Sequence, residues 1–358
     1  MLLLVLAGRL SNRRKDRCGR PPRAATCRLG RQLLSDVDGQ IVRLAGHRDS
    51  GDPVDMMPHP GLRRISELDP SRDYEEIYRL HATIEFPWDI ARALEMALYR
   101  TYCVPSIGSL LHETQEFEQR AQKRYDDTSL LLGEALKFGL NSERGRAAVR
   151  RINQIHSRFS ISNEDMLYVL SVFVVVPLRW LDRFGWRAVT ETERRATYTY
   201  YREIGRRLGI RDIPETREEL FAFCDAYESE HFAYTPANAR VGTATRELFV
   251  GWFWFAPAPL VRMGVHALLD PPVLAAFGFP PAPRPVVRAL EAALRTRARL
   301  VSLLPARRRP SYAQDSWTVR SYPRGYEIGE LGPDGSRRPG ASEPRVRRAT
   351  GQGTPMGQ

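Results

Sequence analysis

Cysteine is scarce in this sequence. The 358 residues include four cysteines, Cys18, Cys27, Cys103 and Cys224, and no two of them form a Cys-x-x-Cys pair. This spacing excludes a zinc ribbon, a dithiol redox motif and a covalently attached c-type haem. Free thiols in a reducing compartment are therefore expected, and with them a cytoplasmic location.

Long hydrophobic runs are missing as well. A membrane-spanning helix needs about 20 apolar residues, whereas the apolar runs 166–176 and 248–260 are shorter and meet prolines. Both runs are expected to form buried core helices. The apolar start at 1–7 is followed closely by Arg9, which makes a poor signal sequence, so a short N-terminal signal or anchor is only the alternative to the cytoplasmic prediction.

The signatures of several large enzyme classes are also absent. The sequence contains no GxGxxG after a strand pattern, no GxxxxGK[ST], no HExxH and no GxSxG. These motifs carry dinucleotide binding, P-loop phosphate binding, zinc proteolysis and α/β-hydrolase chemistry. A helical enzyme without them usually takes its chemistry from a metal or a haem.

The net charge of +12 is concentrated towards the two ends of the chain. Residues 1–60 carry a net charge of +5, residues 306–358 carry +5, and the long central part carries only +2. A nucleic-acid-binding domain would place its basic residues on a folded face. We therefore expect flexible basic tails and no dedicated nucleic-acid binding. The tails could still make peripheral contact with a membrane that contains anionic lipid.

Helical patterns begin near residue 70 and continue almost to the C-terminal tail. Helix boundaries are marked by capping boxes, by a proline at a first helical position and by glycines after last turns. These signals are Thr190 with Glu193, Thr216 with Glu219, Pro87, Gly139 and Gly209. The predicted helices are 72–84, 87–103, 115–138, 142–159, 163–184, 190–208, 216–233, 243–256, 260–269 and 284–304.

No segment shows the sustained alternation of a β-strand with hairpin turns. The fold class predicted is therefore all-α, with a single large helical domain at 70–335. A disordered basic extension is expected at 1–60 and a disordered tail at 336–358. Proline and glycine punctuate 318–331, which predicts an ordered coil near the end of the domain.

His156 is the first candidate functional residue. Together with Val149, Ile152 and Phe159 it follows the 3-4-3 spacing of a core-facing helical stripe. An inward neutral imidazole can ligate a haem iron, and the nearby Arg150, Arg151 and Arg158 could meet haem propionates. The alternative is a buried histidine hydrogen-bonded to the backbone.

Arg124 and Thr128 form a second candidate pair. They are four residues apart, so they share one face of a helix that also carries Leu131 and Leu132. A guanidinium and a hydroxyl on that face could order a polar ligand, a water molecule or bound dioxygen. The alternative is a surface network of Arg124 with the neighbouring aspartates.

The third candidate is Glu228-x-x-His231. A Glu-x-x-His pair is half of a di-iron carboxylate site in helical bundles. A complete site needs a second such pair, and no other histidine here has a glutamate three residues before it. A di-iron oxygenase is therefore the weaker alternative.

The Arg-x3-Thr pair, followed 28 residues later by His156, resembles the rubber-oxygenase catalytic domain. This family joins latex-clearing proteins to the ER-bound oxygenases of mycophenolic acid biosynthesis, and the sequence is most similar to the latter branch. The segments that carry the resemblance are LEMALYRTYCVPS (94–106), KRYDDT (123–128), INQIHSRFSISNEDMLYVLSVFVVVPLRWLDRFGWR (152–187), YREIGRRLGIRDIP (201–214) and YESEHF (227–232).

The resemblance implies an all-α fold with a globin-like core that binds a non-covalent haem b. It implies His156 as the proximal iron ligand, and Arg124 and Thr128 as catalytic and cofactor-binding groups in the haem pocket. The reaction implied is dioxygen-dependent cleavage or oxidation of a C=C bond in an isoprenoid or another unsaturated, lipid-like substrate.

One position departs from the latex-clearing proteins, in which a lysine directly precedes the threonine. Asp127 stands there in this sequence, and Lys123 lies one turn away. The nearest upstream carboxylates for an acid/base role are Glu113 and Glu116. Two other classes remain open: a haem-binding protein without oxygenase turnover, and a metal-free helical protein that binds lipid or a protein partner.

Overall fold

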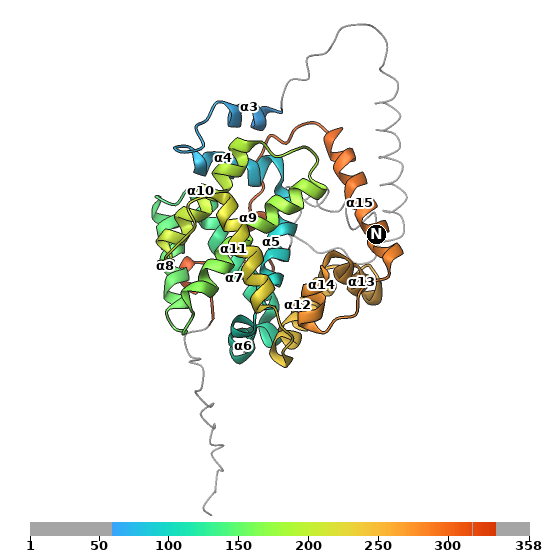
Figure 1. Ribbon diagram of the computed structural model, residues 1–358. Coiled ribbons are helices and arrows are strands. Elements are labelled where there is room, and N and C mark those ends of the chain that lie inside the picture. The colour runs from blue at the N-terminus through green and yellow to red at the C-terminus, as the bar shows by residue number, and fades with distance from the viewer. Residues whose placement is uncertain (1–58, 317, 334–358) are drawn as a thin grey trace, which may run out of the picture.

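The computed structural model describes residues 59–316 and 318–333, and every regular element in these ranges is a helix (Figure 1). The all-α prediction is confirmed for this part of the chain. The predictions of disorder at 1–60 and 336–358 fall almost wholly outside it. The globin-like arrangement of the core stays a prediction.

Thirteen α-helices, α3 to α15, are described, together with one π-helical and two 3₁₀ turns. The α-helices are α3 (Pro60–Ser66), α4 (Tyr74–Leu80), α5 (Pro87–Thr101), α6 (Pro105–Glu113), α7 (Glu116–Phe138), α8 (Glu143–His156), α9 (Asn163–Phe184), α10 (Glu191–Arg207), α11 (Arg217–His231), α12 (Pro236–Trp252), α13 (Ala258–Leu268), α14 (Pro271–Phe277) and α15 (Arg284–Ser302). The shorter turns are η2 (His81–Glu85), η3 (Ala313–Asp315) and η4 (Ile328–Glu330).

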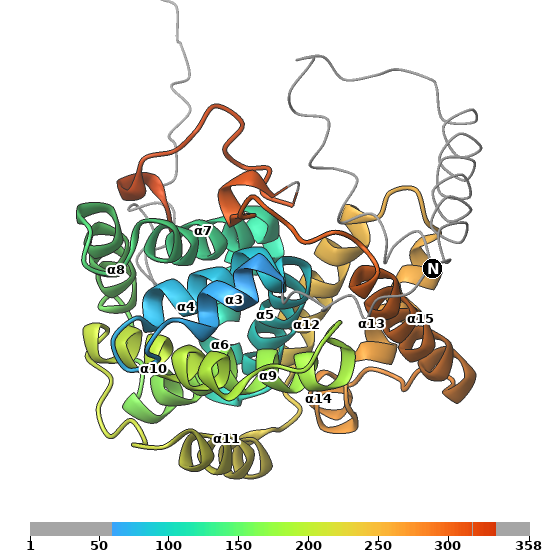
Figure 2. The same cartoon turned by 90° about the horizontal axis from the view of Figure 1, so that it is seen from above.

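Helix α9 forms the centre of the molecule. It packs against α5, α10, α11 and α15, and Figure 2 shows it between α5 and α11. Val172, Val174, Val175 and Leu178 are fully buried, as a helix that is apolar on all sides requires. The apolar run 166–176 is therefore a core helix as predicted, and the helix continues through Pro177.

Local capping explains where the long helices begin. Thr190 and Thr216 each accept a hydrogen bond from the backbone N–H three residues on, and the glutamate at that position binds back to the cap. Gly139 ends α7 with φ of 86°, a conformation that other residues rarely adopt. The predicted capping boxes and this glycine stop are confirmed.

Three short helices, α3, α6 and α14, do not appear among the predicted ones. Each has only seven to nine residues and a proline in its first turn. Helices this short are held by packing rather than by their own periodicity. Helix α12 also begins seven residues earlier than predicted, at Pro236, where Thr235 caps it.

The prediction of a buried core helix over 248–260 is wrong. Helix α12 ends at Trp252, α13 starts at Ala258, and Trp254 and Phe255 between them are 77% and 52% exposed. Pro257 and Pro259 lack the backbone N–H that a continuous helix needs, so the chain turns. Within residues 59–316 and 318–333, each helix is too short or too polar to span a lipid bilayer.

The last described segment, residues 303–333, runs across α7 and is called the C-terminal strap here (Figure 2). Gln122 on α7 donates to the carbonyl of Thr318 at 2.6 Å. The Asp126 carboxylate accepts the backbone N–H groups of Arg320 and Ser321 at 3.0 and 2.7 Å. The strap contains the ordered coil predicted over 318–331, and it holds in place the helix that carries Arg124 and Thr128.

Candidate functional site

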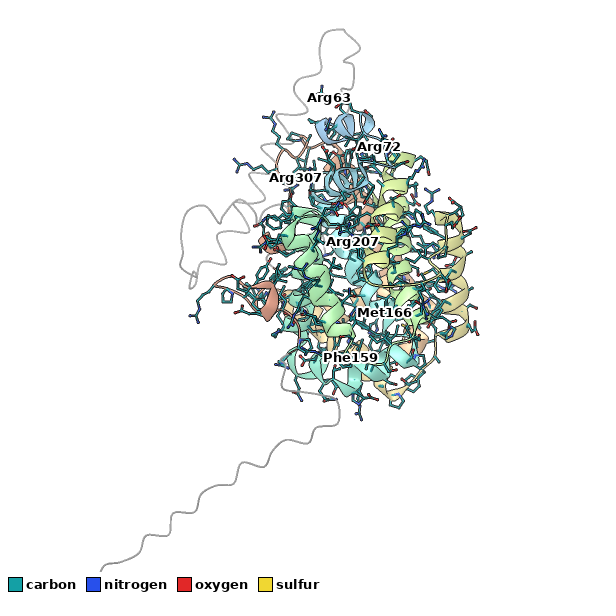
Figure 3. The ribbon with its side chains drawn as sticks, turned by 90° about the vertical axis from the view of Figure 1, so that its left-hand side faces the viewer. Arg63, Arg72, Phe159, Met166, Arg207 and Arg307 are labelled. Atoms are coloured by element: carbon teal, nitrogen blue, oxygen red, sulfur yellow. The ribbon has the colours of Figure 1, made fainter. Side chains whose placement is uncertain are left out.

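Arg124 and Thr128 on α7 and His156 on α8 line one cavity. The cavity lies between α5, α6, α7, α9 and α12, with the end of α8 closing one side. Its outer wall includes Phe159 and Met166, which lie near one another on the face shown in Figure 3. The structure thus brings together all three residues that the sequence selects.

The remaining walls of the cavity are mostly apolar. Their aliphatic and aromatic side chains are Leu98, Tyr102, Ile107, Leu110, Leu111, Phe117, Ile161, Val169, Leu248 and Phe249. Such a lining binds an apolar molecule and leaves orientation to a few polar groups.

His156 is the last residue of α8, and its ring is only partly exposed. Its Nδ1 is buried and has no hydrogen-bond partner in the part of the chain that the structure describes. Burial, and secondarily the charge of Arg124, lowers the pKa of His156 to about 4. The imidazole is therefore neutral near pH 7. The alternative, a buried histidine hydrogen-bonded to the backbone, is not what the structure shows, because the buried Nδ1 has no backbone partner among the described residues.

Arg124 and Thr128 interact directly within α7. The Arg124 guanidinium donates to the Thr128 hydroxyl, which also lies 3.2 Å from the Arg124 carbonyl. The guanidinium sits over the Phe117 ring, 5.7 Å from its centroid. A positive, hydrogen-bonding group is thus placed at one side of an apolar space.

The alternative interpretation of Arg124 was a surface network with the neighbouring aspartates. The structure does not show this network. Asp126 binds the C-terminal strap, and Asp127 is buried against Lys123, 2.9 Å from its Nζ, and against the Tyr322 hydroxyl. Lys123 also donates to the carbonyl of Gly332 at 2.7 Å. Lys123 is thus held at the strap and does not line the cavity.

Glu95 is a cavity residue that sequence reasoning did not select. Its buried carboxylate accepts hydrogen bonds from Arg92 at 2.6 Å and from the Tyr125 hydroxyl at 2.8 Å. Burial raises the pKa of Glu95 above its ordinary value, although Arg92 and Tyr125 oppose this shift. The only sequence signal is indirect, because Tyr125 adjoins Arg124 on α7.

Asp165, in the first turn of α9, also lines the cavity and was not selected as a functional residue. Its Oδ1 accepts from Ser106 at 2.9 Å and from Tyr227 at 2.6 Å. The two carboxylates named earlier lie elsewhere. Glu113 is exposed, and Glu116 forms an ion pair with Arg120.

The Glu228–His231 pair is not arranged as a metal half-site. Arg100 binds both carboxylate oxygens of Glu228, and His231 stacks on Tyr227 with 4.0 Å between ring centroids. Among residues 59–316 and 318–333, no three His, Cys, Asp or Glu side chains gather as a metal site would require. A haem needs only one protein ligand to its iron, and His156 offers a neutral imidazole in an apolar cavity.

Two features bear on the fit of a haem. The donor set fits, because the buried Nδ1 of His156 is unpartnered and Arg124 supplies a cation beside it. The cavity volume is about 150 Å³, below the roughly 300–1,000 Å³ of typical ligand pockets. A haem would therefore require side chains of the cavity wall to move and enlarge the space.

Of the arginines expected near propionates, Arg151 donates to the carbonyl of Leu331 at 2.8 Å, whereas Arg150 and Arg158 are exposed. Arg151 therefore holds the strap. Neither it nor the other two lines the cavity. Arg124 is the arginine that does.

Comparisons with known proteins agree with the resemblance found in the sequence. A family model described as "ER-bound oxygenase mpaB/B'/Rubber oxygenase, catalytic domain" matches residues 88–302. ER-bound oxygenase mpaB of Penicillium brevicompactum is 30% identical over 247 residues, which cover 64% of this chain and 63% of that protein. ER-bound oxygenase mpaB' of the same fungus is 31% identical over 175 residues, covering 44% and 41%.

A third relative, ER-bound oxygenase mpaB of Penicillium roqueforti, is 36% identical over 141 residues, covering 38% of this chain and 47% of that protein. The chain thus spans less than two thirds of the length of each of these curated relatives. Their names describe them as ER-bound, which overturns the cytoplasmic location predicted from the sequence. Scarce cysteine and short apolar runs do not report how a protein attaches to a membrane.

Proposed function

Because the chain belongs to the family of ER-bound oxygenases mpaB/B' and rubber oxygenases, we propose that it is a haem b-dependent oxygenase. Its substrate is an isoprenoid or another unsaturated, lipid-like molecule whose C=C bond is cleaved or oxidised with dioxygen. The catalytic domain corresponds to residues 70–335. The observation that carries the proposal is that His156, whose buried Nδ1 is unpartnered, lines the same cavity as Arg124 and Thr128.

His156 is the iron ligand in this proposal, and the haem supplies the activation of dioxygen that no side chain provides. The low pKa of His156 keeps the imidazole unprotonated near pH 7, so no proton has to leave before it can bind a metal. Its place at the end of α8, where the chain turns towards Phe159, lets the ring face the cavity instead of a neighbouring helix turn.

Arg124 and Thr128 form the polar end of the cavity. The guanidinium can donate to a ligand oxygen while the Thr128 hydroxyl holds its orientation, since the two groups already share a hydrogen bond. In an apolar site such a charge-assisted donor acts more strongly than it would in water.

The apolar walls hold the substrate and exclude water. Leu110, Leu248 and Phe249 face the polar groups from α6 and α12 and offer no hydrogen bond that would compete with them. This lining favours a hydrocarbon chain over a sugar or nucleotide, because polar groups buried there would lose their hydrogen bonds to water.

Glu95 is placed to hold or release a proton at this site. Its raised pKa makes the carboxyl easier to protonate than an exposed glutamate, and the Tyr125 hydroxyl fixes one of its oxygens. A carboxyl of this kind can act as a general acid or base towards an oxygenated intermediate or product.

The test is an absorption spectrum of the purified protein, with iron quantified, beside the variants His156→Ala and His231→Ala. We expect a Soret band in the parent protein and in His231→Ala, and a lost or shifted band in His156→Ala. His231 is the matched control because it also ends a helix but lies outside the cavity. A colourless, iron-free protein that fails to take up added haem would overturn the proposal and leave a metal-free lipid- or partner-binding protein.

Turnover is tested separately, by dioxygen uptake with squalene and by mass spectrometry of carbonyl products. Arg124→Ala and Glu95→Gln are expected to lower turnover by about 10²-fold or more. A haem-loaded protein that consumes no dioxygen with squalene or with other unsaturated lipids would instead be a haem-binding protein without oxygenase activity.

A further inference from the structure

The connection between α12 and α13 exposes an apolar surface. We call residues 253–260 the aromatic turn. Trp254, Phe255 and Leu260 are 77%, 52% and 39% exposed, and they make up half of the exposed large hydrophobic side chains in the described part of the chain. No charged residue occurs between Glu247 and Arg262. Side chains of this size gathered on a surface usually mark a binding site.

The aromatic turn is also structurally constrained. Pro257 caps α13 and Pro259 lies in its first turn, so both ends of the exposed segment are held by helices. Trp252, directly before the turn, is buried and packs against Tyr125, with 4.7 Å between ring centroids. The exposed tip therefore projects from a fixed base.

We propose that the aromatic turn docks on the surface of an anionic lipid bilayer. Tryptophan and phenylalanine are favoured at the membrane interface, where an apolar ring and polar surroundings meet. Two aromatic rings and one leucine form a patch too small for a stable protein–protein interface, which buries about 800 Å² per partner. The relatives named ER-bound show that a membrane setting occurs among proteins of this family.

The charge next to the aromatic turn favours an anionic surface. Helix α13 packs against α15, and Figure 2 shows the two side by side. Helix α15 carries the exposed residues Arg284, Arg288, Arg295 and Arg299, whose spacing of four, seven and four places them on one side. The helix contains a single acidic residue, Glu291, which pairs with Arg295 and with Arg183 and leaves Arg284, Arg288 and Arg299 to face an anionic surface. Arginines near a bilayer add an electrostatic attraction that salt weakens.

The turn lies close to the cavity along the chain and in space. Thr245, Leu248 and Phe249 on α12 line the cavity, and the turn starts one helical turn later. A docked turn would bring the cavity wall near the lipid, where an apolar substrate partitions. This consequence rests on the proposed function, whereas docking itself does not.

The test is flotation of the full chain with vesicles of phosphatidylcholine alone or mixed with phosphatidylserine. The parent protein is compared with the double variant Trp254→Ser/Phe255→Ser and with the control Tyr234→Ser. Tyr234 is 60% exposed but lies outside the turn. All three proteins carry the same residues 1–58, so a difference in binding reports the turn.

We expect the double variant to lose about tenfold or more in partitioning to the mixed vesicles, with Tyr234→Ser unchanged. Arg284→Gln/Arg288→Gln is expected to weaken binding to the mixed vesicles and to reduce its dependence on salt. Circular dichroism checks that each variant is folded. We expect each to fold, because all the substituted side chains are exposed.

Equal binding of the parent protein and the double variant, or no binding to either vesicle, would overturn the inference. Binding that ignores phosphatidylserine would overturn its electrostatic part. The haem spectrum of the double variant separates this inference from the proposed function, because Trp254 and Phe255 do not line the cavity. Vesicle binding without a haem spectrum would contradict the proposed function alone, and a haem spectrum without vesicle binding would contradict the docking inference alone.

Discussion

At the scale of single residues, Asp127 stands where latex-clearing proteins have a lysine, and the structure gives this aspartate a structural role. It follows Asp126 on α7 and precedes Thr128, yet its carboxylate faces away from the cavity. The side chain is buried between Lys123 and Tyr322. The residue that replaces lysine thus joins α7 to the C-terminal strap.

Replacing Asp127 by alanine is expected to lower the free energy of unfolding by about 3 kcal/mol. The variant leaves the Lys123 ammonium and the Tyr322 hydroxyl without their shared acceptor. Urea unfolding measures the change. Asp225→Ala is the control, because its pair with Arg179 is exposed on both sides and is worth at most about 1 kcal/mol. Equal losses in the two variants would contradict the structural role of Asp127.

At the scale of elements, α12 and α14 owe their close packing to one glycine. A Cβ added at Gly242 would lie 2.6 Å from the Phe277 ring, and the Gly242 carbonyl accepts the Tyr99 hydroxyl at 2.6 Å. A glycine inside a helix costs about 1 kcal/mol relative to alanine. Here it is required because the aromatic ring of α14 lies against the α12 backbone.

Gly242→Ala is therefore expected to destabilise the protein by about 1–3 kcal/mol, despite the higher helix propensity of alanine. Gly251→Ala on the same helix is the matched control. A Cβ at Gly251 would meet nothing within 4 Å, so this variant should be neutral or stabilised by up to about 1 kcal/mol. Thermal unfolding of both variants measures the contrast, and a stabilised Gly242→Ala would disprove the close contact.

The strap depends on a second carboxylate of α7, Glu134. It accepts hydrogen bonds from the Tyr326 hydroxyl at 2.6 Å, from Gln314 at 3.2 Å and from Arg144 at 2.5 Å. Burial alone would raise the pKa of Glu134, but the hydrogen bonds from Arg144, Tyr326 and Gln314 outweigh it and lower the pKa below 4.5. The ionised form therefore holds the strap.

This lowered pKa predicts how stability varies with pH. Glu134 binds fewer protons in the folded state than in the unfolded state, so its contribution is fully present above pH 4.5 and is lost as the pH falls through its folded pKa. Glu134→Gln should remove this part of the acid sensitivity. Urea unfolding of both proteins at a series of pH values below 5 measures it. Parallel curves for the two would refute the assignment.

At the scale of the whole molecule, the cavity collects side chains from six helices, so a ligand there stabilises the folded state alone. Haem at about 100 times its Kd is expected to add about 2.7 kcal/mol to the free energy of unfolding and to raise Tm. Scanning calorimetry with and without haem measures the shift. His156→Ala should show none, and a shift of equal size in this variant would place the haem elsewhere.

The sequence predicts the long helices because capping and helical spacing are local. The gathering of Arg124, Thr128 and His156 in one pocket was implied instead by the resemblance to the rubber-oxygenase family. The sequence does not predict that Glu95 and Asp165 line the cavity, because other helices bury them there and their neighbours in the chain give no signal of it. The exposure of the aromatic turn was not predicted for the same reason. The apolar run with prolines was predicted to be core, whereas the structure leaves Trp254 77% exposed.

The strap also bears on how the protein is made. Gln122 meets its acceptor at Thr318 only after 196 further residues have been synthesised. At about 5–20 residues per second, this delay is about 10–40 s on the ribosome. Helix α7 and the cavity wall that it carries must wait that long for their final support. The emerging chain is therefore exposed to proteases and chaperones during this interval, and loss of the C-terminal segment by early termination would leave α7 without these hydrogen bonds.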